Sequence, residues 1–161
     1  MHPRARELIA ALQLQPHPEG GHYREIYRSA TGVARGADAV PRSALTVIHF
    51  LLARGSVSRW HQVQADEAWH FIEGAPLQLS EFPAAGGGGR HVTLGPVAAG
   101  STPVHVVPAG HWQGARTEGE YTLVACSVGP GFDFADFRLL ADLPEDQRPA
   151  PADLPLWRAL L

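Results

Sequence analysis

From Ala44 onward the sequence is a series of short apolar runs rich in β-branched and aromatic residues. The runs read ALTVIHFLL, SVSRWHQV, EAWHFIEG, PLQLSEF, HVTLG, PVHVVP, YTLVACSV and FDFADFRLL, with glycine, proline or polar residues between them. Runs of this length and composition are typical of β-strands. Because no helix-length amphipathic segment separates them, the pattern favours an antiparallel sandwich or small barrel over βαβ units. The predicted fold class is therefore all-β.

The N-terminal part adds a short helix before the strands begin. Leu8, Ile9 and Leu12 recur at helical intervals after Pro3, which predicts an amphipathic helix over residues 4–14. Two prolines and two glycines in QPHPEGG then predict a turn, and HYREIYRS follows as the first expected strand. The paired glycines would let the backbone come close to another strand or to a ligand.

The C-terminal part is a proline-rich tail over residues 141–161. Its last segment, LPLWRALL, is expected to form at most a short closing helix that packs Leu156, Trp157 and Leu160 on the outside of the barrel. A chain of 161 residues is long enough for one hydrophobic core. We therefore expect a single domain over residues 1–161, with the barrel at about 22–140.

Charge and cysteine content exclude several classes of function. The formal net charge is -3 and basic residues do not cluster, so neither a nucleic-acid footprint nor an anionic-membrane patch is expected. The single cysteine, Cys126, cannot form an internal disulfide and lies in an apolar run, where a buried inert thiol is expected. The first residues lack the apolar core of a signal peptide, and no apolar run is long enough to span a bilayer. A cytoplasmic protein is therefore expected.

The stretch GSVSRWHQVQADEAWHFIEG, residues 55–74, carries the most specific pattern. It can be written G(x)5HxV(x)3E(x)6G, which resembles the first cupin motif, G(x)5HxH(x)3E(x)6G, with Val63 in place of the second histidine. PAGHWQ further on resembles the core of the second motif, PxGxxH, with Gln113 in place of histidine. Together with LQPHPEGGHYREIYRS and PGFDFADF, these segments are similar to the cupin subfamily known as domain of unknown function 985. One departure is His49, where related sequences tend to carry an aromatic residue.

The resemblance implies a double-stranded β-helix, the cupin jelly-roll barrel of RmlC-like proteins, and usually a homodimer. In most cupins three imidazoles and one carboxylate hold a transition metal inside the barrel. Here His61 and Glu67 remain, Gln113 could add only a weak carbonyl oxygen, and Val63 offers no donor. We therefore expect no cofactor, or at most a weakly bound divalent metal on His61, Glu67 and Gln113.

Strand alternation predicts which side chains share the barrel interior. If Glu67 points inward, Trp69 and Phe71 share its face, and His70 points the other way. Trp69 and Phe71 would pack in the core and also form an apolar wall for a small ligand. His61 and Glu67 are the predicted catalytic residues, since burial and mutual charge could poise the pair for proton transfer near neutral pH. A purely structural His–Glu pair is the alternative.

The first expected strand holds further candidate ligand-binding residues. Tyr23 or Glu25 is expected to reach the mouth of the barrel, with Arg24 or Arg28 available for an acidic group on the ligand. The alternative is an edge strand whose charges discourage aggregation. Gln113 completes the predicted binding set if the cupin register holds.

Three functions remain compatible with these residues. The first is a metal-independent isomerase or epimerase acting on a small polar metabolite, with His61 as base and Glu67 as its partner. It is supported by analogy with metal-free cupin-like sugar epimerases, which use a histidine from the matching strand. The second is a metal-dependent oxygenase or isomerase with a reduced ligand set. The third is a non-catalytic protein that binds a small molecule in the same pocket.

Overall fold

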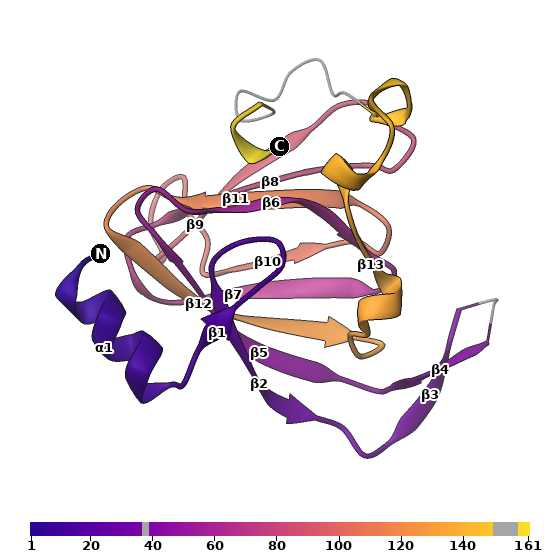
Figure 1. The fold of residues 1–161 in the computed structure, drawn as a ribbon, viewed down its shortest axis with the longest axis horizontal. Coiled ribbons are helices and arrows are strands. Elements are labelled where there is room, and N and C mark those ends of the chain that lie inside the picture. The colour runs from indigo at the N-terminus through magenta and orange to yellow at the C-terminus, as the bar shows by residue number, and fades with distance from the viewer. Residues whose placement is uncertain (37–38, 150–157) are drawn as a thin grey trace.

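The computed structural model describes residues 1–36, 39–149 and 158–161, and in it two antiparallel sheets face each other (Figure 1). Strand order in the larger sheet is β1-β2-β5-β12-β7-β10, and in the smaller sheet it is β13-β6-β11-β8-β9. The bounds of the larger sheet's strands are β1 Gln15–Pro16, β2 His22–Arg28, β5 Thr46–Ala53, β7 Asp66–Gly74, β10 Val104–Val107 and β12 Tyr121–Gly129. Those of the smaller sheet are β6 Val57–Val63, β8 Leu77–Phe82, β9 Arg90–Leu94, β11 Trp112–Thr117 and β13 Phe137–Leu139. This jelly-roll sandwich confirms the all-β prediction.

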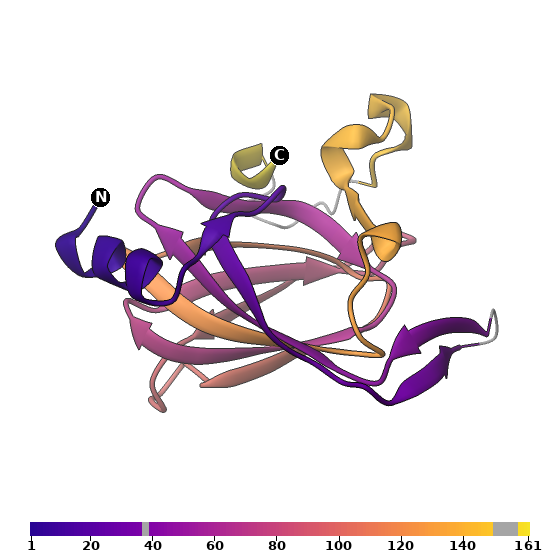
Figure 2. The same cartoon turned by 60° about the horizontal axis from the view of Figure 1, so that its bottom comes forward.

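The remaining elements lie around the two sheets. Helix α1 (Pro3–Ala11) covers one end of the larger sheet, and the hairpin of β3 (Gly32–Arg35) and β4 (Val40–Ser43) projects from the other end (Figures 1 and 2). Short 3-10 helices follow β12, namely η1 Phe134–Asp136, η2 Leu140–Asp142, η3 Glu145–Gln147 and η4 Arg158–Leu160. No helix in the part of the chain that the structure describes has the length and hydrophobicity required to cross a membrane.

The main core fills the space between the sheets. Alternate residues of β5, β7 and β8 point into it, among them Phe50, Leu52, Trp69 and Leu79, all at most 1 % exposed. Burying each such side chain contributes about 1.5–3 kcal/mol. The residue between the first two, Leu51, points the other way and is covered by α1. Both faces of the second half of β5 are therefore buried, which explains why residues 50–53 are continuously apolar.

The outer face of the smaller sheet is covered by the C-terminal part of the chain. Trp60 and Trp112 point away from the barrel and pack with Leu140 and Leu160, the last from the closing 3-10 helix. Leu160 therefore packs where the sequence predicted. The same prediction for Leu156 and Trp157 falls outside the described residues.

Two local predictions were wrong. The N-terminal helix ends at Ala11 rather than residue 14, because Gln13 takes a positive φ of 54° and the amide of Leu14 turns back to the Ile9 carbonyl at 2.9 Å. The segment FDFADF was expected to be a strand and instead forms a loop with one 3-10 turn. Asp133 caps that turn by accepting a hydrogen bond from the Ala135 amide at 2.8 Å, which explains the break in extended structure.

Candidate functional site

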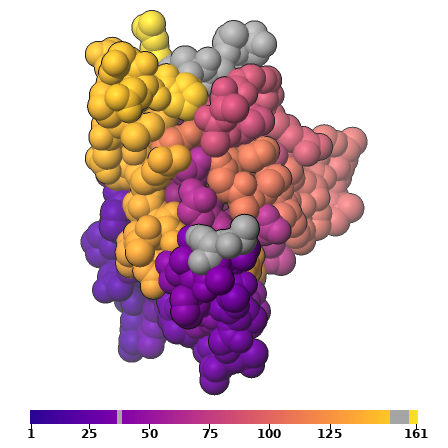
Figure 3. Space-filling model, turned by 90° about the vertical axis from the view of Figure 1, so that its right-hand side faces the viewer, coloured from indigo at the N-terminus to yellow at the C-terminus, as the bar shows by residue number. Residues whose placement is uncertain are grey.

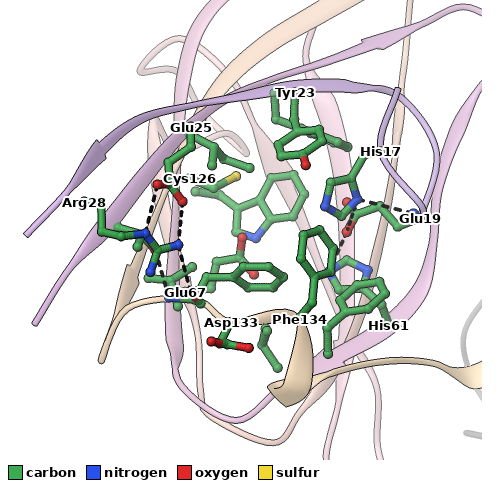
Figure 4. Close-up of a pocket in the computed structure, with 18 of the residues that line it drawn as sticks. His17, Glu19, Tyr23, Glu25, Arg28, His61, Glu67, Cys126, Asp133 and Phe134 are labelled. Carbon is green, nitrogen blue, oxygen red and sulfur yellow. Dashed lines mark hydrogen bonds and ion pairs between the residues drawn. The ribbon is translucent and has the colours of Figure 1, made fainter. Parts of the chain in front are cut away.

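One cavity of about 440 Å³ opens into the barrel between the two sheets. Its walls come from β2, β5, β6, β7 and β12, from the loop between β1 and β2, and from the aromatic segment after β12. The volume lies within the range of about 300–1,000 Å³ that is usual for small-molecule sites. Figure 4 shows the labelled side chains converging on this space from opposite sides.

Five of the seven predicted site residues line this cavity. His61 on β6 and Glu67 on β7 reach it from different sheets, and Tyr23, Glu25 and Trp69 complete the group. His61 is 2 % exposed and Glu67 7 % exposed, so both hold polar groups away from bulk water. Burial of two ionisable groups at one cavity is unusual unless each has a polar partner.

The other two predicted residues, Phe71 and Gln113, do not line the cavity. Phe71 shares the inward side of β7 but packs against the core beyond Trp69. Gln113 is fully buried behind Glu67, whose Oε2 accepts a hydrogen bond from its side-chain nitrogen at 2.5 Å. Gln113 therefore acts on the site only through Glu67.

The orientation of the Gln113 amide follows from its neighbours. Trp69 Nε1 lies 2.9 Å from the other end of this amide, and an indole N–H can only donate. That end must therefore be the amide oxygen, and the NH2 group faces Glu67. The oxygen that would have served as a metal ligand is already used by Trp69.

The remaining donors do not fit a tightly held metal. Val63 lines the cavity where the usual motif has its second histidine, which leaves His61 and Glu67 as the motif's two strong donors. Among the described residues, no group of three or more His, Cys, Asp or Glu side chains is arranged to hold a metal ion. The motif positions alone, with one imidazole and one carboxylate, lack the donors that transition metals require for tight binding.

Sequence reasoning missed two residues of the cavity, His17 and Glu19, in the loop between β1 and β2. This loop folds over the barrel because Gly20 and Gly21 take positive φ values of 111° and 67°. A Cβ on Gly20 would clash with the carbonyl oxygen of Val57 on β6, so the loop can approach β6 only with glycine there. The paired glycines in the sequence indicated this close approach. The approach brings His17 and Glu19, which precede the glycines, to the cavity.

Glu19 lies between two imidazoles whose protonation can be assigned from their contacts. His61 Nδ1 is 2.8 Å from the carbonyl oxygen of Arg59, which only accepts, so Nδ1 carries a hydrogen. Burial lowers the pKa of His61, which leaves Nε2 with a lone pair. His17 Nδ1 accepts a hydrogen bond from the Glu19 amide at 3.3 Å, so it also presents a lone pair. Glu19 Oε2 lies 3.4 Å from His61 Nε2 and 3.3 Å from His17 Nδ1.

A carboxyl oxygen that faces the lone pairs of two imidazole nitrogens is stable only if it carries a proton that it can donate to one of them. Glu19 is therefore a carboxylic acid that can donate to either imidazole, while its Oε1 accepts a hydrogen bond from Ser58 at 2.8 Å. Its pKa is raised to about 8, chiefly by burial, against weaker opposing effects of Ser58 and Arg59. Geometry and electrostatics agree that this carboxyl holds a proton at neutral pH.

Burial governs the other titratable groups of the cavity in the same way. It raises the pKa of Glu67 to about 7, although the nearby His61 acts in the opposite direction. Burial lowers the pKa of His17 to about 4 and also lowers that of His61. The Cys126 thiol beside Glu67 has its pKa raised well above the usual value by burial, which makes it unreactive as a nucleophile. At neutral pH Glu19 and the two imidazoles are thus uncharged, and Glu67 is close to its titration midpoint.

Neither arginine of β2 is free for an acidic ligand group, which corrects the sequence hypothesis. Arg24 points away from the cavity and binds the carbonyl oxygen of Leu12 and the side chain of Gln13. Arg28 does line the mouth, but Glu25 holds it through Nε–Oε1 at 2.9 Å and Nη2–Oε2 at 2.7 Å (Figure 4). A bidentate pair of this kind neutralises the guanidinium.

The aromatic segment after β12 forms one wall of the cavity and is tied to the β3–β4 hairpin. Asp136 receives Arg42 Nε and Nη2, each at 2.7 Å, and also pairs with Arg35. In Figure 3 this segment runs down to the hairpin on the face shown. The two ion pairs span residues far apart in the chain and fix the wall that carries Phe132, Phe134 and Phe137.

Comparison with known proteins gives a family and related structures. The family model described as cupin superfamily (DUF985) matches residues 6–140. A hypothetical protein from Leishmania major is similar at 36% identity, with 83% of this chain and 85% of that chain covered and a TM-score of 0.78. A protein from Shewanella oneidensis is similar at 35% identity, with 91% and 98% covered and a TM-score of 0.75. Oxalate decarboxylase from Bacillus subtilis, at 15% identity, 81% and 32% coverage and a TM-score of 0.58, shares the fold alone. A search of curated proteins found no match.

Proposed function

From the premise that this chain belongs to the DUF985 family of the cupin superfamily, we propose that its cavity binds a small polar metabolite and transfers a proton on it without a metal. The reaction class is that of an isomerase or epimerase. The observation that carries the proposal is the position of Glu19 Oε2 between two unprotonated imidazole nitrogens, beside a second buried carboxyl group, Glu67. Such a set can both accept and donate a proton near neutral pH.

Each group has a role that its environment supports. His61 is neutral and presents Nε2 to the cavity, so it can remove a proton from a carbon next to a carbonyl while the Glu19 proton rests on the His17 side. The C–H electron pair forms a C=C bond while the π pair of the carbonyl moves to its oxygen, which takes a proton from Glu67, whose pKa of about 7 makes this exchange reversible. Returning a proton to carbon, at another position or on the other face, completes an isomerisation with no co-reactant.

A non-catalytic binding protein is the second candidate, favoured by the aromatic lining. Residues such as Trp69 and Phe137 give the cavity a large apolar surface, which is typical of ligand sites whether or not they catalyse a reaction. The two candidates differ in whether the ligand exchanges a carbon-bound proton with solvent.

The test is to screen metabolites for thermal stabilisation and then incubate each hit with the protein in D2O. We expect deuterium at one carbon of the ligand, detected by mass spectrometry and NMR. His61→Gln should slow exchange by about 10²–10⁴-fold, the usual contribution of a general base. Glu120→Gln is the matched control, because Glu120 pairs with Arg54 on the surface and does not line the cavity. Ligands recovered without deuterium would identify a binding protein.

The fold of the variants decides whether the residues are functional or structural. His61→Gln and Glu67→Gln should retain the wild-type far-ultraviolet circular dichroism and lose ligand-induced stabilisation. If both variants fail to fold, the pair is structural and the proposal is wrong.

A further inference from the structure

The charges around the cavity are almost all negative or absent. Four carboxyl groups line it, from Glu19, Glu25, Glu67 and Asp133, and Arg28 is the one guanidinium among the described lining residues. Arg28 donates two hydrogen bonds from one edge of its guanidinium, Nε and Nη2, to Glu25 and a third, from Nη2, to the Phe132 carbonyl at 3.1 Å. A carboxylate or phosphate on the ligand would find no unpaired cation here.

The lining is also rich in aromatic faces. In Figure 4 Tyr23 and Phe134 lie on opposite sides of the cavity. The lining also includes Trp69, and Phe134 belongs to a group of three rings, Phe132, Phe134 and Phe137. The last three meet edge to face, with centroids 5.0 Å apart for Phe132–Phe134 and 6.1 Å for Phe134–Phe137. Phe134 remains 51% exposed at the mouth.

Aromatic faces and carboxyl groups together form a characteristic environment for organic cations. The face of an aromatic ring attracts positive charge, and quaternary ammonium groups are held in proteins by aromatic cages of this kind. From this combination we propose that the ligand of the cavity carries a protonated amine or a quaternary ammonium group. The cation would lie between the two aromatic sides, with Glu25 and Asp133 near it at the mouth. This inference rests on the proposed function of the cavity as a small-molecule site.

Three probes of nearly equal shape separate charge from size. Choline carries a trimethylammonium group, 3,3-dimethylbutan-1-ol replaces its nitrogen by carbon, and 3,3-dimethylbutanoate carries a negative charge. Of the tryptophans in the described residues, Trp69 lines the cavity, whereas Trp60 and Trp112 pack on the outer face of the smaller sheet. The indole N–H signal of Trp69, assigned with Trp69→Phe, therefore reports occupancy of the site in a ¹H–¹⁵N spectrum.

We expect choline to shift the Trp69 signal with an affinity about tenfold higher than that of the neutral alcohol. The carboxylate should leave the signal in place at the same concentrations. Equal affinities for choline and the alcohol, tighter binding of the carboxylate, or no shift with choline would each overturn the inference.

A charge change at the mouth should alter this preference. Glu25→Gln removes the partner of Arg28 and adds one net positive charge beside the cavity, so choline should bind less tightly and the carboxylate should begin to bind. Glu120→Gln changes the net charge of the protein equally but lies away from the cavity, and it should leave all three affinities unchanged. If both variants change the affinities alike, binding depends on overall charge and the inference is wrong.

The outcomes also separate this inference from the proposed function. Binding of the neutral alcohol without preference for choline overturns the ligand class but leaves a small-molecule cavity. Deuterium exchange on an uncharged or anionic ligand would likewise support the proposed function while contradicting the cation. If the proposed function is wrong, the exchange experiment shows it, because the ligands are then recovered without deuterium.

Discussion

The barrel interior contains two sets of one glutamate and two histidines, and the two behave in opposite ways. Glu19 lies between His17 and His61 in the cavity, and Glu81 on β8 lies between His105 and His111. The carboxyl groups are equally shielded, with side-chain exposures of 8% for Glu19 and 6% for Glu81. Yet the pKa of Glu19 is raised to about 8, whereas that of Glu81 is lowered.

The difference comes from the histidines. Side-chain exposure is 6% for His17 and 3% for His61, but 12% for His105 and 28% for His111. Burial would raise the pKa of Glu81 too, but hydrogen bonds and charge from His105 and His111 outweigh it. In the cavity, burial keeps both imidazoles neutral, so they supply lone pairs rather than positive charge. The same residue types therefore raise the pKa of the carboxyl group in one place and lower it in the other.

The two sets are close neighbours in the fold. His61, Gln113 and Glu81 lie side by side across β6, β11 and β8, so the three side chains share the inward face of the smaller sheet. Gln113 stands between the two sets, donates a hydrogen bond to Glu67 and accepts one from Trp69.

The largest expected effect is on stability, when each glutamate is replaced by glutamine. Glu81→Gln should lower the free energy of unfolding by about 1–3 kcal/mol at pH 6, because it weakens charge-assisted hydrogen bonds at 3.0 and 3.3 Å. Glu19→Gln should change it by less than about 1 kcal/mol, since the volume is kept and the NH2 group can donate to both imidazoles. Urea denaturation measures both changes. Equal losses in the two variants would show that Glu19 is ionised in the folded protein.

The next effect is on the pH dependence of stability. Glu19 and Glu67 have folded pKa values of about 8 and 7 against an ordinary 4.5, so the stability they contribute is complete below 4.5 and is lost as pH rises through 7 and 8. His17, with a folded pKa of about 4 against 6.5, and His61 act in the opposite sense below 6.5. Above 6.5 the glutamates act alone, so the free energy of unfolding should fall between pH 6.5 and 8.

The expected slope between pH 6.5 and 8 is about 1 kcal/mol per pH unit for Glu19 and about half of that for Glu67. Glu19→Gln should remove the part of the slope that comes from Glu19. Glu120→Gln, on the surface, should leave the slope unchanged. Glu81 acts on the acid side instead, because a lowered pKa stabilises the fold above 4.5 and that gain is lost at lower pH. A wild-type stability that stays flat or rises from pH 6.5 to 8 would contradict the proton on Glu19.

The smallest expected effect is that the His61 imidazole in the cavity does not titrate near neutral pH. His61 should keep its hydrogen on Nδ1 and an unprotonated Nε2 from pH 6.5, the ordinary pKa of histidine, up to about pH 7.5, because burial lowers its pKa. Long-range ¹H–¹⁵N spectra distinguish the two nitrogens directly. A His61 signal that moves to the doubly protonated position within this interval would remove the base from the proposed mechanism.

Much of the fold and half of the site could be predicted from the sequence. The alternation around Glu67 and Trp69 placed both side chains inside, because a strand can direct alternate residues only to opposite faces. The same alternation could not tell that the cavity ends before Phe71, because its extent depends on other strands and loops. Loop residues such as His17 and Glu19 follow no period, and only the two glycines after them indicated a close approach.

The sequence by itself determined the family, the all-β architecture and the pairing of His61 with Glu67 at one cavity, since strand periodicity and motif spacing are local properties of the chain. Only the tertiary structure decided that Glu19 holds a proton, that Gln113 faces Trp69 with its oxygen, and that Arg28 is neutralised by Glu25. Protonation and hydrogen-bond direction depend on burial and on partners brought from distant parts of the chain. Those quantities exist only once the two sheets and the loop over them have come together.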